Sequence, residues 1–526
     1  MKTEGIQIIG YSLKSPDRTR DGFQPINPAT KKPAGDITYY SATEKEMDEA
    51  MKLAAAAFES YKNMPASRRA EFLRAIADEI EASGEALTQT GTAETGLPAG
   101  RLNGERGRTT GQLRMFADYI EEGYYVQAII DEALPERTPP RSDLRRMNHP
   151  LGPVVVFGAS NFPLAFSVAG GDTASALASG CPVVVKAHPA HPGTSEIAGR
   201  AIMRAAQKTN MPEGVFSMVQ GNSHESGSYL VTHPSACAVG FTGSYAGGKA
   251  LYDLAQKRSV PIPVYSEMGS SNPVFILPGA LAKNKDDIAE KLTGSVNLGA
   301  GQFCTNPGLV MVPAGEDTEE FSRSLTESFS SQAGQVMLTE GIHSAYNKGK
   351  ERLEKNKAYT LLAKGEKGEN ALAGEPAMFR ADYKEVQSDP KLTEEVFGPS
   401  SILITTEQEE DILQFARSLE GHLTVTLHAT DEDSDLVSKL LPILQEKAGR
   451  IIFNGYPTGV EVCHAMVHGG PYPATTMPGT TSVGTSAIYR FLRPVCYQDT
   501  PDPFLPDALK AANPLGIRRL VNGEWK

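Results

Sequence analysis

The chain has 526 residues, of which 40% are hydrophobic and 22% charged, as expected for a globular enzyme of roughly two to four domains. Its net charge of −12 argues against a nucleic-acid or anionic-membrane surface, and no apolar run reaches the roughly 18 residues of a membrane span. Residues 1–14 lack a signal peptide, and the five cysteines form no CxxC pairs, so we expect a cytoplasmic protein without disulfides or a zinc cluster.

The first part of the chain is predicted to be mostly helical. Residues 1 to about 40 are irregular, with short strands. Ser41 and Glu44 have the spacing of a capping box, in which the two side chains satisfy free amides at the start of a helix. Apolar residues then recur at helical spacing, which predicts amphipathic helices around 47–58, 72–80 and 104–121.

From residue 151 onward the pattern changes to short β-branched runs that alternate with segments of helical length. The runs cover residues 154–157, 183–185, 215–219, 238–241 and 262–265. They do not alternate between apolar and polar residues, as expected for parallel strands that are buried on both faces, and crossovers of this length indicate a parallel sheet with helices on both sides. Such sheets bind ligands at the carboxyl ends of their strands.

The rest of the chain is expected to contain a second α/β region, an extended arm and an ordered loop. A second α/β region is expected from about 270 to 470. The stretch at about 131–150, rich in Pro, Arg and Asp, is expected to be an extended arm, and residues 469–486, rich in Gly and Thr, an ordered loop.

Cys304 is the first candidate for chemistry. It follows the small residues of segment 299–301, which let a substrate approach and leave backbone amides free to point at it. A buried structural cysteine is the alternative, and for a lone cysteine that alternative is the commoner case.

Two polar residues follow predicted strands of the parallel sheet. Asn161 comes after the first strand, where its amide can donate to a developing oxyanion, although a turn-forming Asn has the same pattern. Glu267 comes after the last strand, where a carboxylate can activate water, although a solvated or helix-capping carboxylate is the alternative.

Two other strand ends suggest a dinucleotide. Gly243, Ser244 and Gly248 form a glycine-rich strand-to-helix turn of the kind that holds a pyrophosphate, but the turn is not GxGxxG and a plain tight turn is the alternative. Lys186 ends the second strand, where it can bind ribose hydroxyls or phosphate unless it simply faces solvent.

Together these segments resemble the aldehyde dehydrogenase superfamily, in matching order along nearly the whole chain. The resemblance rests on the segments 161–163, 241–248, 267–269, 301–304 and 395–399. It implies an α/β fold with a Rossmann-type parallel-sheet coenzyme domain (1–130 and 151–268), an α/β catalytic domain (269–470), an oligomerisation arm (131–150 and 483–500) and a C-terminal tail (501–526). Segments 157–167, 186–192 and 468–473 resemble the branch that contains 2-oxoglutarate semialdehyde dehydrogenases and NADP-preferring fatty aldehyde dehydrogenases.

The resemblance also implies a mechanism. The Cys304 thiolate attacks the aldehyde, and the Asn161 amide with the Cys304 N–H holds the oxyanion. Hydride passes to the nicotinamide, and Glu267 activates the water that hydrolyses the thioester. Relatives that transfer the acyl group to coenzyme A or phosphate tend to lack this base, so a free acid is expected, with no metal ion.

The coenzyme is expected to be NADP, with dual use of NAD left open. NAD-preferring relatives often carry a Glu three positions after the Lys, and here that position is Pro189. Lys186 and His188 can therefore attract a 2′-phosphate, with His224 a weaker candidate and a plain loop histidine the alternative for His188. The resemblance adds Met268, Glu395 and Phe397 to the coenzyme site, Glu395 holding the nicotinamide ribose.

The substrate is expected to be 2-oxoglutarate semialdehyde (2,5-dioxopentanoate). Phe162, Phe166 and Phe303 should line an apolar tunnel to the nucleophile. Relatives place a tunnel-mouth residue at about Arg108, where a guanidinium can clamp a carboxylate; a surface Arg paired with Glu105 or another acid is the alternative.

Two alternative functions remain at this point. One is a broad-specificity or fatty aldehyde dehydrogenase, which the phenylalanines equally allow, and the other is a catalytically silent structural homologue. The arm segments resemble the family's oligomerisation strands, so a homodimer or homotetramer is expected.

Overall fold

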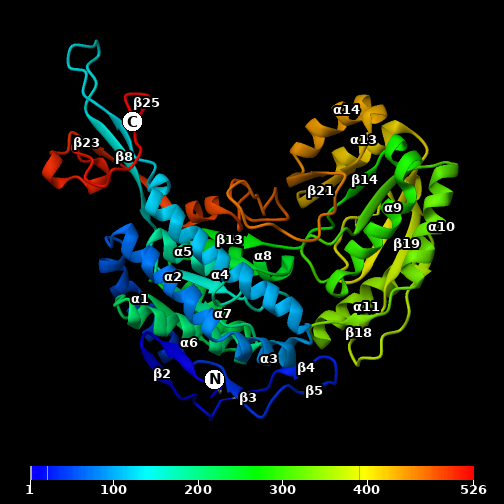
Figure 1. The fold of residues 1–526 in the computed structure, drawn as a ribbon, viewed down its shortest axis with the longest axis horizontal. Helices are drawn as coiled ribbons and strands as arrows, with labels where there is room; N and C mark the ends of the chain where they lie inside the picture. Colours follow the sequence, from blue (N-terminus) through cyan, green and yellow to red (C-terminus); the bar gives the residue numbers. More distant parts are fainter. Residues whose placement is uncertain (1–2, 21, 390) are drawn as a thin grey trace.

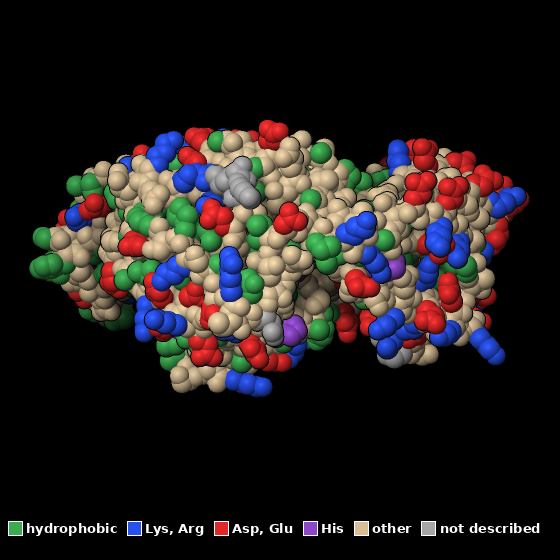
Figure 2. All heavy atoms as spheres, turned by 90° about the horizontal axis from the view of Figure 1, so that it is seen from below, with side chains coloured by type: hydrophobic (Ala, Val, Ile, Leu, Met, Phe, Trp, Pro, Cys, Tyr) green, Lys and Arg blue, Asp and Glu red, His purple; other side chains and the backbone are tan. Residues whose placement is uncertain are grey.

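The computed structural model describes residues 3–20, 22–389 and 391–526, and arranges them in two α/β lobes and a projecting arm (Figure 1). The larger lobe is blue to green in Figure 1 and the smaller lobe is green to orange. Figure 2 shows a hollow between the two lobes on the face that it presents.

The larger lobe is built on a seven-stranded sheet in the order β13-β12-β9-β10-β11-β1-β2. The strands from β13 to β11 are parallel, and β1 and β2 join the edge in antiparallel register. The five valine-rich runs of the sequence overlap the five parallel strands. The bounds are β1 Gln7–Ile9, β2 Ser12–Lys14, β9 Val154–Phe157, β10 Val183–Lys186, β11 Phe216–Val219, β12 Ala238–Thr242 and β13 Val264–Glu267.

Helices cover both faces of this sheet, which explains why its parallel strands are mostly apolar and do not alternate. Val154 and Val156 pack into a core with α2, α4, α5 and α6, whereas Val155 between them packs with α1, α7 and α8. The helices are α1 Glu44–Tyr61, α2 Ala66–Ala82, α3 Gly84–Thr95, α4 Ala99–Glu122, α5 Gly171–Ser179, α6 Pro192–Lys208, α7 His224–Thr232 and α8 Tyr245–Gln256.

The expected capping box at the start of α1 was assigned to the wrong pair of residues. Thr43 has extended dihedral angles and is the N-cap; its hydroxyl accepts from the Glu46 amide at 3.1 Å, and the Glu46 carboxylate accepts from the Thr43 amide at 2.7 Å. Ser41 instead hydrogen-bonds Asn222. The motif lies two residues later because the chain is still extended at residue 43.

The smaller lobe contains a second seven-stranded sheet in the order β17-β19-β20-β15-β14-β21-β22, parallel except for the β17–β19 pair. Its strands are β14 Val274–Ile276, β15 Leu309–Pro313, β17 Thr360–Lys364, β19 Ala377–Asp382, β20 Ser400–Thr406, β21 His422–His428 and β22 Ala448–Phe453. Its helices are α9 Pro278–Asn297, α10 Glu316–Ser330, α11 Glu340–Lys355, α12 Tyr383–Val386, α13 Glu409–Ser418 and α14 Ser434–Gln445.

The arm is a five-stranded sheet in the order β23-β8-β7-β24-β25, at the upper left of Figure 1. Strands β8 (Leu144–Pro150) and β23 (Leu492–Gln498) pair antiparallel along their whole length. The end of the chain extends this sheet, because β7 (Ile129–Asp131) pairs with β24 (Leu520–Val521), which pairs with β25 (Glu524–Trp525).

Short elements complete the described chain. Three two-stranded ladders join β3 Gly22–Phe23 to β6 Tyr39–Tyr40, β4 Ile26–Asn27 to β5 Lys32–Pro33, and β16 Gln335–Val336 to β18 Ala373–Gly374. Short helical turns are η1 Tyr124–Val126, η2 Leu298–Gly301, η3 Asp431–Asp433, η4 Thr485–Phe491, η5 Asp502–Phe504 and η6 Asp507–Leu509.

The loop that follows β22 returns from the smaller lobe to the end of β13. Thr475 forms a β-bridge with Glu267, and the Met268 amide donates to the Ala474 carbonyl at 2.8 Å. The loop therefore fixes the backbone on which the predicted general base stands.

Candidate active site

Cys304 lies in a tight turn that only small residues allow. Residues Gly299, Ala300 and Gly301 all have left-handed dihedral angles, and a Cβ on Gly301 would lie 2.2 Å from the Gly398 carbonyl oxygen. The Cys304 carbonyl accepts from the Asn272 amide at 2.9 Å. Within the described chain the Cys304 N–H has no hydrogen-bond partner, so it is free to donate to a ligand.

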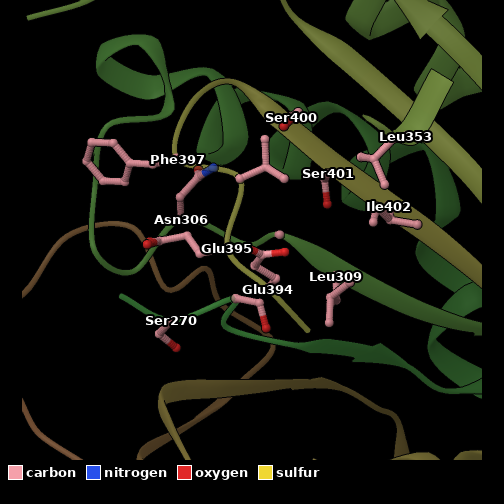
Figure 3. A pocket seen from close by; sticks show the side chains of 13 residues that line it. Ser270, Asn306, Leu309, Leu353, Glu394, Glu395, Phe397, Ser400, Ser401 and Ile402 are labelled. Carbon is pink, nitrogen blue, oxygen red and sulfur yellow. The ribbon is translucent and has the colours of Figure 1, made fainter. Parts of the chain in front are cut away.

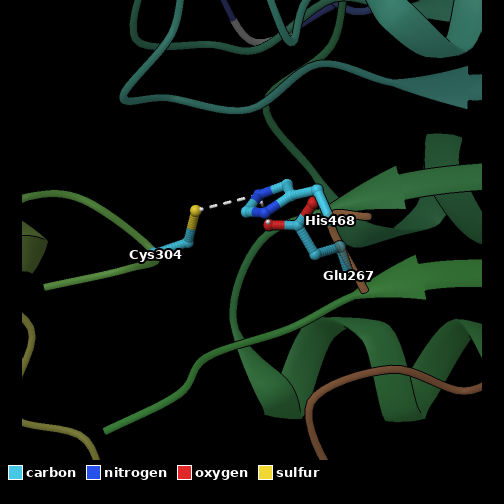
Figure 4. A group of neighbouring side chains, drawn as sticks. All are labelled: Glu267, Cys304 and His468. Atoms are coloured by element: carbon cyan, nitrogen blue, oxygen red, sulfur yellow. Dashed lines mark hydrogen bonds and ion pairs between the residues drawn. The ribbon is translucent and has the colours of Figure 1, made fainter. Parts of the chain in front are cut away.

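Glu267 and His468 meet the nucleophile from the other side (Figure 4). The His468 Nε2 atom lies 3.4 Å from the Cys304 sulfur and 2.9 Å from Glu267 Oε1. The second carboxylate oxygen of Glu267 accepts from the Ser482 hydroxyl at 2.7 Å. The histidine and the carboxylate are both buried, so their pairing is shielded from water.

The protonation of this group is set by burial and by its mutual contacts. Burial raises the pKa of the Glu267 carboxyl, but the charge of His468 and hydrogen bonds from His468 and Ser482 outweigh it and hold the pKa below its ordinary value. Burial, and then the negative charge of Glu267, raise the pKa of the Cys304 thiol well above its ordinary value. The resting site therefore holds a charged carboxylate beside a neutral thiol.

Asn161 lies beside the nucleophile segment, in the loop that follows β9. Its amide donates to the Gln302 carbonyl at 3.1 Å. The next turn of this loop is held by Glu105 of α4, whose Oε1 atom accepts from the Leu164 and Ala165 amides at 2.8 and 2.9 Å. Helix α4 thus positions the predicted oxyanion donor.

A cavity of about 320 Å³ leads to Cys304. The three predicted phenylalanines line it: the Phe162 ring meets the Phe166 and Phe303 rings edge-on, at centroid distances of 5.3 and 5.5 Å. This apolar wall shapes a narrow passage to the thiol.

Arg108 also lines the cavity, and its charge is poorly satisfied within the described chain. One guanidinium nitrogen donates to the Val460 carbonyl at 2.7 Å, and the group lies 5.3 Å from the Phe166 ring centroid. The other two guanidinium nitrogens are buried without a hydrogen-bond partner. Buried donors without a hydrogen-bond partner are rare in folded proteins. Arg108 therefore differs from a surface arginine paired with Glu105 or another acid, which was the alternative from the sequence.

Arg101 is a second cation of the cavity that the sequence reasoning missed. It lies 4.5 and 4.8 Å from the ring centroids of Phe162 and Phe303, and its Nε is 3.7 Å from Glu105. Arg101, Glu105 and Arg108 are four and three residues apart on α4, a spacing that places them on one face of the helix. That spacing is the sequence signal that could have identified Arg101.

The carboxyl ends of the parallel strands carry the expected coenzyme residues. Ser244 is the N-cap of α8 and accepts from the Gly247 amide at 3.2 Å. A Cβ on Gly248 would lie 2.7 Å from the Met268 sulfur, so this helix approaches the sheet where only glycine fits. A glycine turn that opens a helix in this way fits a pyrophosphate.

Lys186 ends β10, and no hydrogen bond or ion pair joins its ammonium group to another residue that the structure describes. Burial lowers its pKa to about 8. His188 is stacked on His191, and burial lowers the pKa of His188 well below its ordinary value, so its ring is neutral. His224 is exposed at the first position of α7. A ligand phosphate would thus meet one cation and one neutral imidazole here.

Glu395 lies in the smaller lobe, at the centre of a narrow cavity of about 20 Å³, and Phe397 is turned away from it (Figure 3). A Cβ on Gly269 would lie 2.1 Å from the Glu395 carboxylate, so this side chain packs against the backbone just after Glu267. Burial raises the pKa of Glu395 to about 8.

The contacts of His468 and Ser482 were also missed from the sequence. His468 was noted only as part of a motif of one branch, and nothing in the sequence predicted that it contacts Glu267 and Cys304. The signal that could have found it is a histidine in an otherwise small-residue segment, 468–473, that returns to the sheet. Among the described residues, no helix is long and apolar enough to cross a membrane.

This arrangement is that of an aldehyde dehydrogenase. The model of the aldehyde dehydrogenase family matches residues 15–471, and the chain therefore belongs to that family. The resemblance and the fold expected from the sequence are confirmed, and with them an enzyme that oxidises an aldehyde with a nicotinamide coenzyme.

Two relatives match over nearly their full lengths. Alpha-ketoglutaric semialdehyde dehydrogenase 2 of Azospirillum brasilense is 51% identical over 525 residues, which cover 100% of both chains. Alpha-ketoglutaric semialdehyde dehydrogenase of Acinetobacter baylyi is 47% identical over 503 residues, 95% of both chains. Among solved structures, betaine aldehyde dehydrogenase of Staphylococcus aureus in complex with NAD+ has a TM-score of 0.78 at 20% identity, covering 95% of this chain and 96% of the other.

Proposed function

We propose that the chain oxidises 2-oxoglutarate semialdehyde to 2-oxoglutarate. The observation that carries this proposal is Arg108, a buried guanidinium with two unpartnered nitrogens in the cavity that ends at Cys304. A substrate with a carboxylate at the end opposite its aldehyde would satisfy those donors, and charged hydrogen bonds of this kind contribute about 1.5–3 kcal/mol each. Relatives of 51% and 47% identity named for the same substrate support the assignment.

The chemistry follows from the positions of the residues. The Cys304 sulfur attacks the aldehyde carbon as a thiolate. The neighbouring Glu267 carboxylate takes the thiol proton and passes it to solvent, so that this group is charged again for the second step. The free Cys304 N–H and the Asn161 amide hold the oxyanion of the thiohemiacetal. A nicotinamide coenzyme, when bound, would supply the hydride acceptor that oxidation of this adduct to a Cys304 thioester requires. Glu267, held by Ser482, then takes a proton from the attacking water, and the thiol and the free acid are released.

We assign the coenzyme-binding role to residues 1–130 and 151–268, and the nucleophile to the domain of residues 269–470. The glycine turn at Gly243 and Gly248, with Ser244, holds the pyrophosphate, and Met268 supports helix α8 at Gly248. Glu395 faces the nicotinamide ribose, whereas Phe397 is turned away from the Glu395 cavity and is assigned to the coenzyme site by the family resemblance alone. NADP is the preferred coenzyme, because Lys186 presents an unpaired ammonium and Pro189 leaves no carboxylate to repel a 2′-phosphate. His188 contributes a neutral donor, and His224 lies at the start of α7, after the next strand.

The test is the rate of coenzyme reduction with the semialdehyde and with hexanal, each with NADP and with NAD. We expect a large preference for the semialdehyde and for NADP. In Arg108→Met, kcat/KM for the semialdehyde should fall by roughly 10²-fold, which is the loss of one or two charged hydrogen bonds, while that for hexanal stays close to the wild-type value. Arg106→Met is the matched control, because Arg106 pairs with Glu81 and does not line the cavity.

Comparable turnover of hexanal, with Arg108→Met impairing both substrates equally, would replace this proposal by a broad-specificity or fatty aldehyde dehydrogenase, with which the phenylalanine wall is equally compatible. No turnover of any aldehyde, together with a Cys304 thiol that does not react when coenzyme is bound, would indicate a silent homologue. We further propose that the arm assembles the chain into a homodimer or homotetramer.

A further inference from the structure

Cys304, His468 and Glu267 have the donor types and the spacing of a metal site. The thiol sulfur, the imidazole Nε2 and one carboxylate oxygen all lie within 4.8 Å of one another. They approach from three separate segments, the turn after η2, the returning loop and the end of β13, and Figure 4 shows them converging on one point. Ser482 binds the other oxygen of Glu267 and leaves Oε1 facing the group.

The distances suit a small tetrahedral ion. Bonds of about 2.3 Å to sulfur and 2.0–2.2 Å to nitrogen or oxygen separate the ligand atoms of tetrahedral Zn²⁺ by roughly 3.3–3.6 Å. The sulfur and Nε2 are already 3.4 Å apart, and Nε2 is 2.9 Å from Oε1, so one contact must open by a few tenths of an ångström. Mixed sulfur, nitrogen and oxygen ligands favour zinc over magnesium or calcium.

We propose that this trio binds Zn²⁺ as a reversible inhibitor, with a water molecule in the fourth position. The ion replaces two protons, that of the Cys304 thiol and that which His468 Nε2 shares with Glu267, and both are released to solvent. His468 then binds as neutral imidazole and Glu267 as carboxylate. Two negative ligands then balance the two positive charges of the ion. Because the ion occupies the sulfur and the base at once, it blocks both the attack on the aldehyde and the activation of water.

Nearby charged residues limit the affinity of the trio for Zn²⁺. Arg108 and Arg450 are close enough to interact electrostatically with Cys304, and both oppose a cation at the sulfur. Glu395 interacts with the same thiol and favours the cation. The inhibition by Zn²⁺ rests on the proposed function, in which Cys304 is the nucleophile. The binding of Zn²⁺ does not, and it is measured without any substrate.

The experiment uses the metal-free full-length enzyme. Zn²⁺ is titrated in competition with a chromophoric chelator, and Co²⁺ is added separately as a spectroscopic probe. We expect one tight equivalent per chain, a thiolate-to-cobalt charge-transfer band, and loss of aldehyde oxidation that is restored by EDTA. The cobalt band should disappear in Cys304→Ser, and Zn²⁺ should bind at least about tenfold more weakly to His468→Asn and Glu267→Gln.

Two variants control for other thiols and imidazoles. Cys496→Ser removes an exposed thiol and His464→Asn an exposed histidine four positions before His468, and both should bind as the wild type does. Circular dichroism checks that Cys304→Ser is folded. A cobalt–thiolate band that persists in Cys304→Ser, or unchanged affinity in His468→Asn, would overturn the proposal. An enzyme that binds zinc but oxidises no semialdehyde would instead contradict only the proposed function.

Discussion

At the scale of single residues, the active site couples the charge of Glu267 to the reactivity of Cys304. Burial is the main reason why the pKa of the Cys304 thiol is raised, and the Glu267 carboxylate adds to it. The same carboxylate is held in its charged form by His468 and Ser482, although burial opposes this. In the proposed mechanism, the carboxylate that serves as base in the second half of the reaction therefore makes the proposed nucleophile harder to ionise in the first half.

This coupling predicts opposite effects of one substitution on two measurements. In Glu267→Gln the negative charge is gone, so the pKa of the Cys304 thiol should fall and its alkylation by iodoacetamide should begin at lower pH than in the wild type. Aldehyde oxidation should fall by about 10²–10⁴-fold, because the general base is lost. Mass spectrometry of the peptide that carries Cys304 gives the alkylation rate as a function of pH.

The control for this prediction is Glu290→Gln, an exposed carboxylate on α9 that should change neither measurement. An alkylation profile that is unchanged in Glu267→Gln, or displaced to higher pH, would show that the carboxylate does not act on the thiol as the distances imply. Such a result would leave burial as the sole cause of the raised thiol pKa.

Local segments of the sequence predict Cys304, Glu267 and Asn161 as site residues, but not their contacts. The structure places Glu267 in one group with Cys304 and His468, and the Asn161 amide on the Gln302 carbonyl beside Cys304. The contact of His468 with Cys304 spans 164 positions of the chain, and no local pattern reports such a distance. Arg101 was missed for another reason, because its role becomes visible only when the faces of α4 are assigned.

At the scale of elements, helix α4 connects substrate recognition to the catalytic loop. Glu105 lies between Arg101 and Arg108 on the face of the helix that lines the cavity. Its Oε1 atom holds the Leu164 and Ala165 amides, while Oε2 faces Arg101 at 3.7 Å. One carboxylate thus fixes both the loop that carries Asn161 and a cation of the cavity wall.

Two substitutions of Glu105 separate these roles. Glu105→Ala leaves two buried amides unpaired, so the free energy of unfolding should fall by about 1–3 kcal/mol and kcat/KM should fall about tenfold for both the semialdehyde and hexanal. Glu105→Gln retains an oxygen for the amides and loses only the charge beside Arg101. It should keep its activity toward hexanal and lose activity toward the semialdehyde.

Chemical denaturation and initial rates with the two aldehydes check this pair. Full hexanal activity in Glu105→Ala would mean that the loop holds its position without the carboxylate. Equal losses for both aldehydes in Glu105→Gln would mean that the charge of Glu105 supports the loop rather than Arg101.

The elements themselves were predicted where their signal is local. The five β-branched runs overlap the five parallel strands. A strand that is buried on both faces needs apolar residues at successive positions, so each run carries its own signal. The antiparallel strand β1, which lies between β11 and the edge strand β2, was not specified, because its partner β11 is about two hundred residues away and a three-residue strand carries little pattern of its own. The capping box was misplaced by two residues, an error within the usual uncertainty of helix ends.

At the scale of the whole molecule, the arm and the C-terminal segment carry an unusual share of exposed apolar side chains. Phe504 is 78% exposed, Trp525 58%, Leu515 53% and Leu134 42%. The left end of the molecule, where Figure 1 places this sheet, shows clustered hydrophobic side chains in Figure 2. Strand β23 also lies at the edge of its sheet, with backbone groups free to pair. A second chain that covers this region would explain both features.

The proposed oligomer predicts that one exposed residue of the arm region behaves as a buried one. Phe504→Asp would cost little in a monomer, because the side chain already faces solvent, but it would place a charge in an apolar interface between chains. Sedimentation velocity over a range of protein concentrations should therefore show smaller species for this variant than for the wild type. Val260→Asp is the matched control, since Val260 is 69% exposed on the loop before β13, away from the arm, and its substitution should leave the mass unchanged. If Phe504→Asp sediments as the wild type does at every concentration, the apolar surface of the C-terminal segment is not an interface, and assembly, where it occurs, must use the edge of β23 alone.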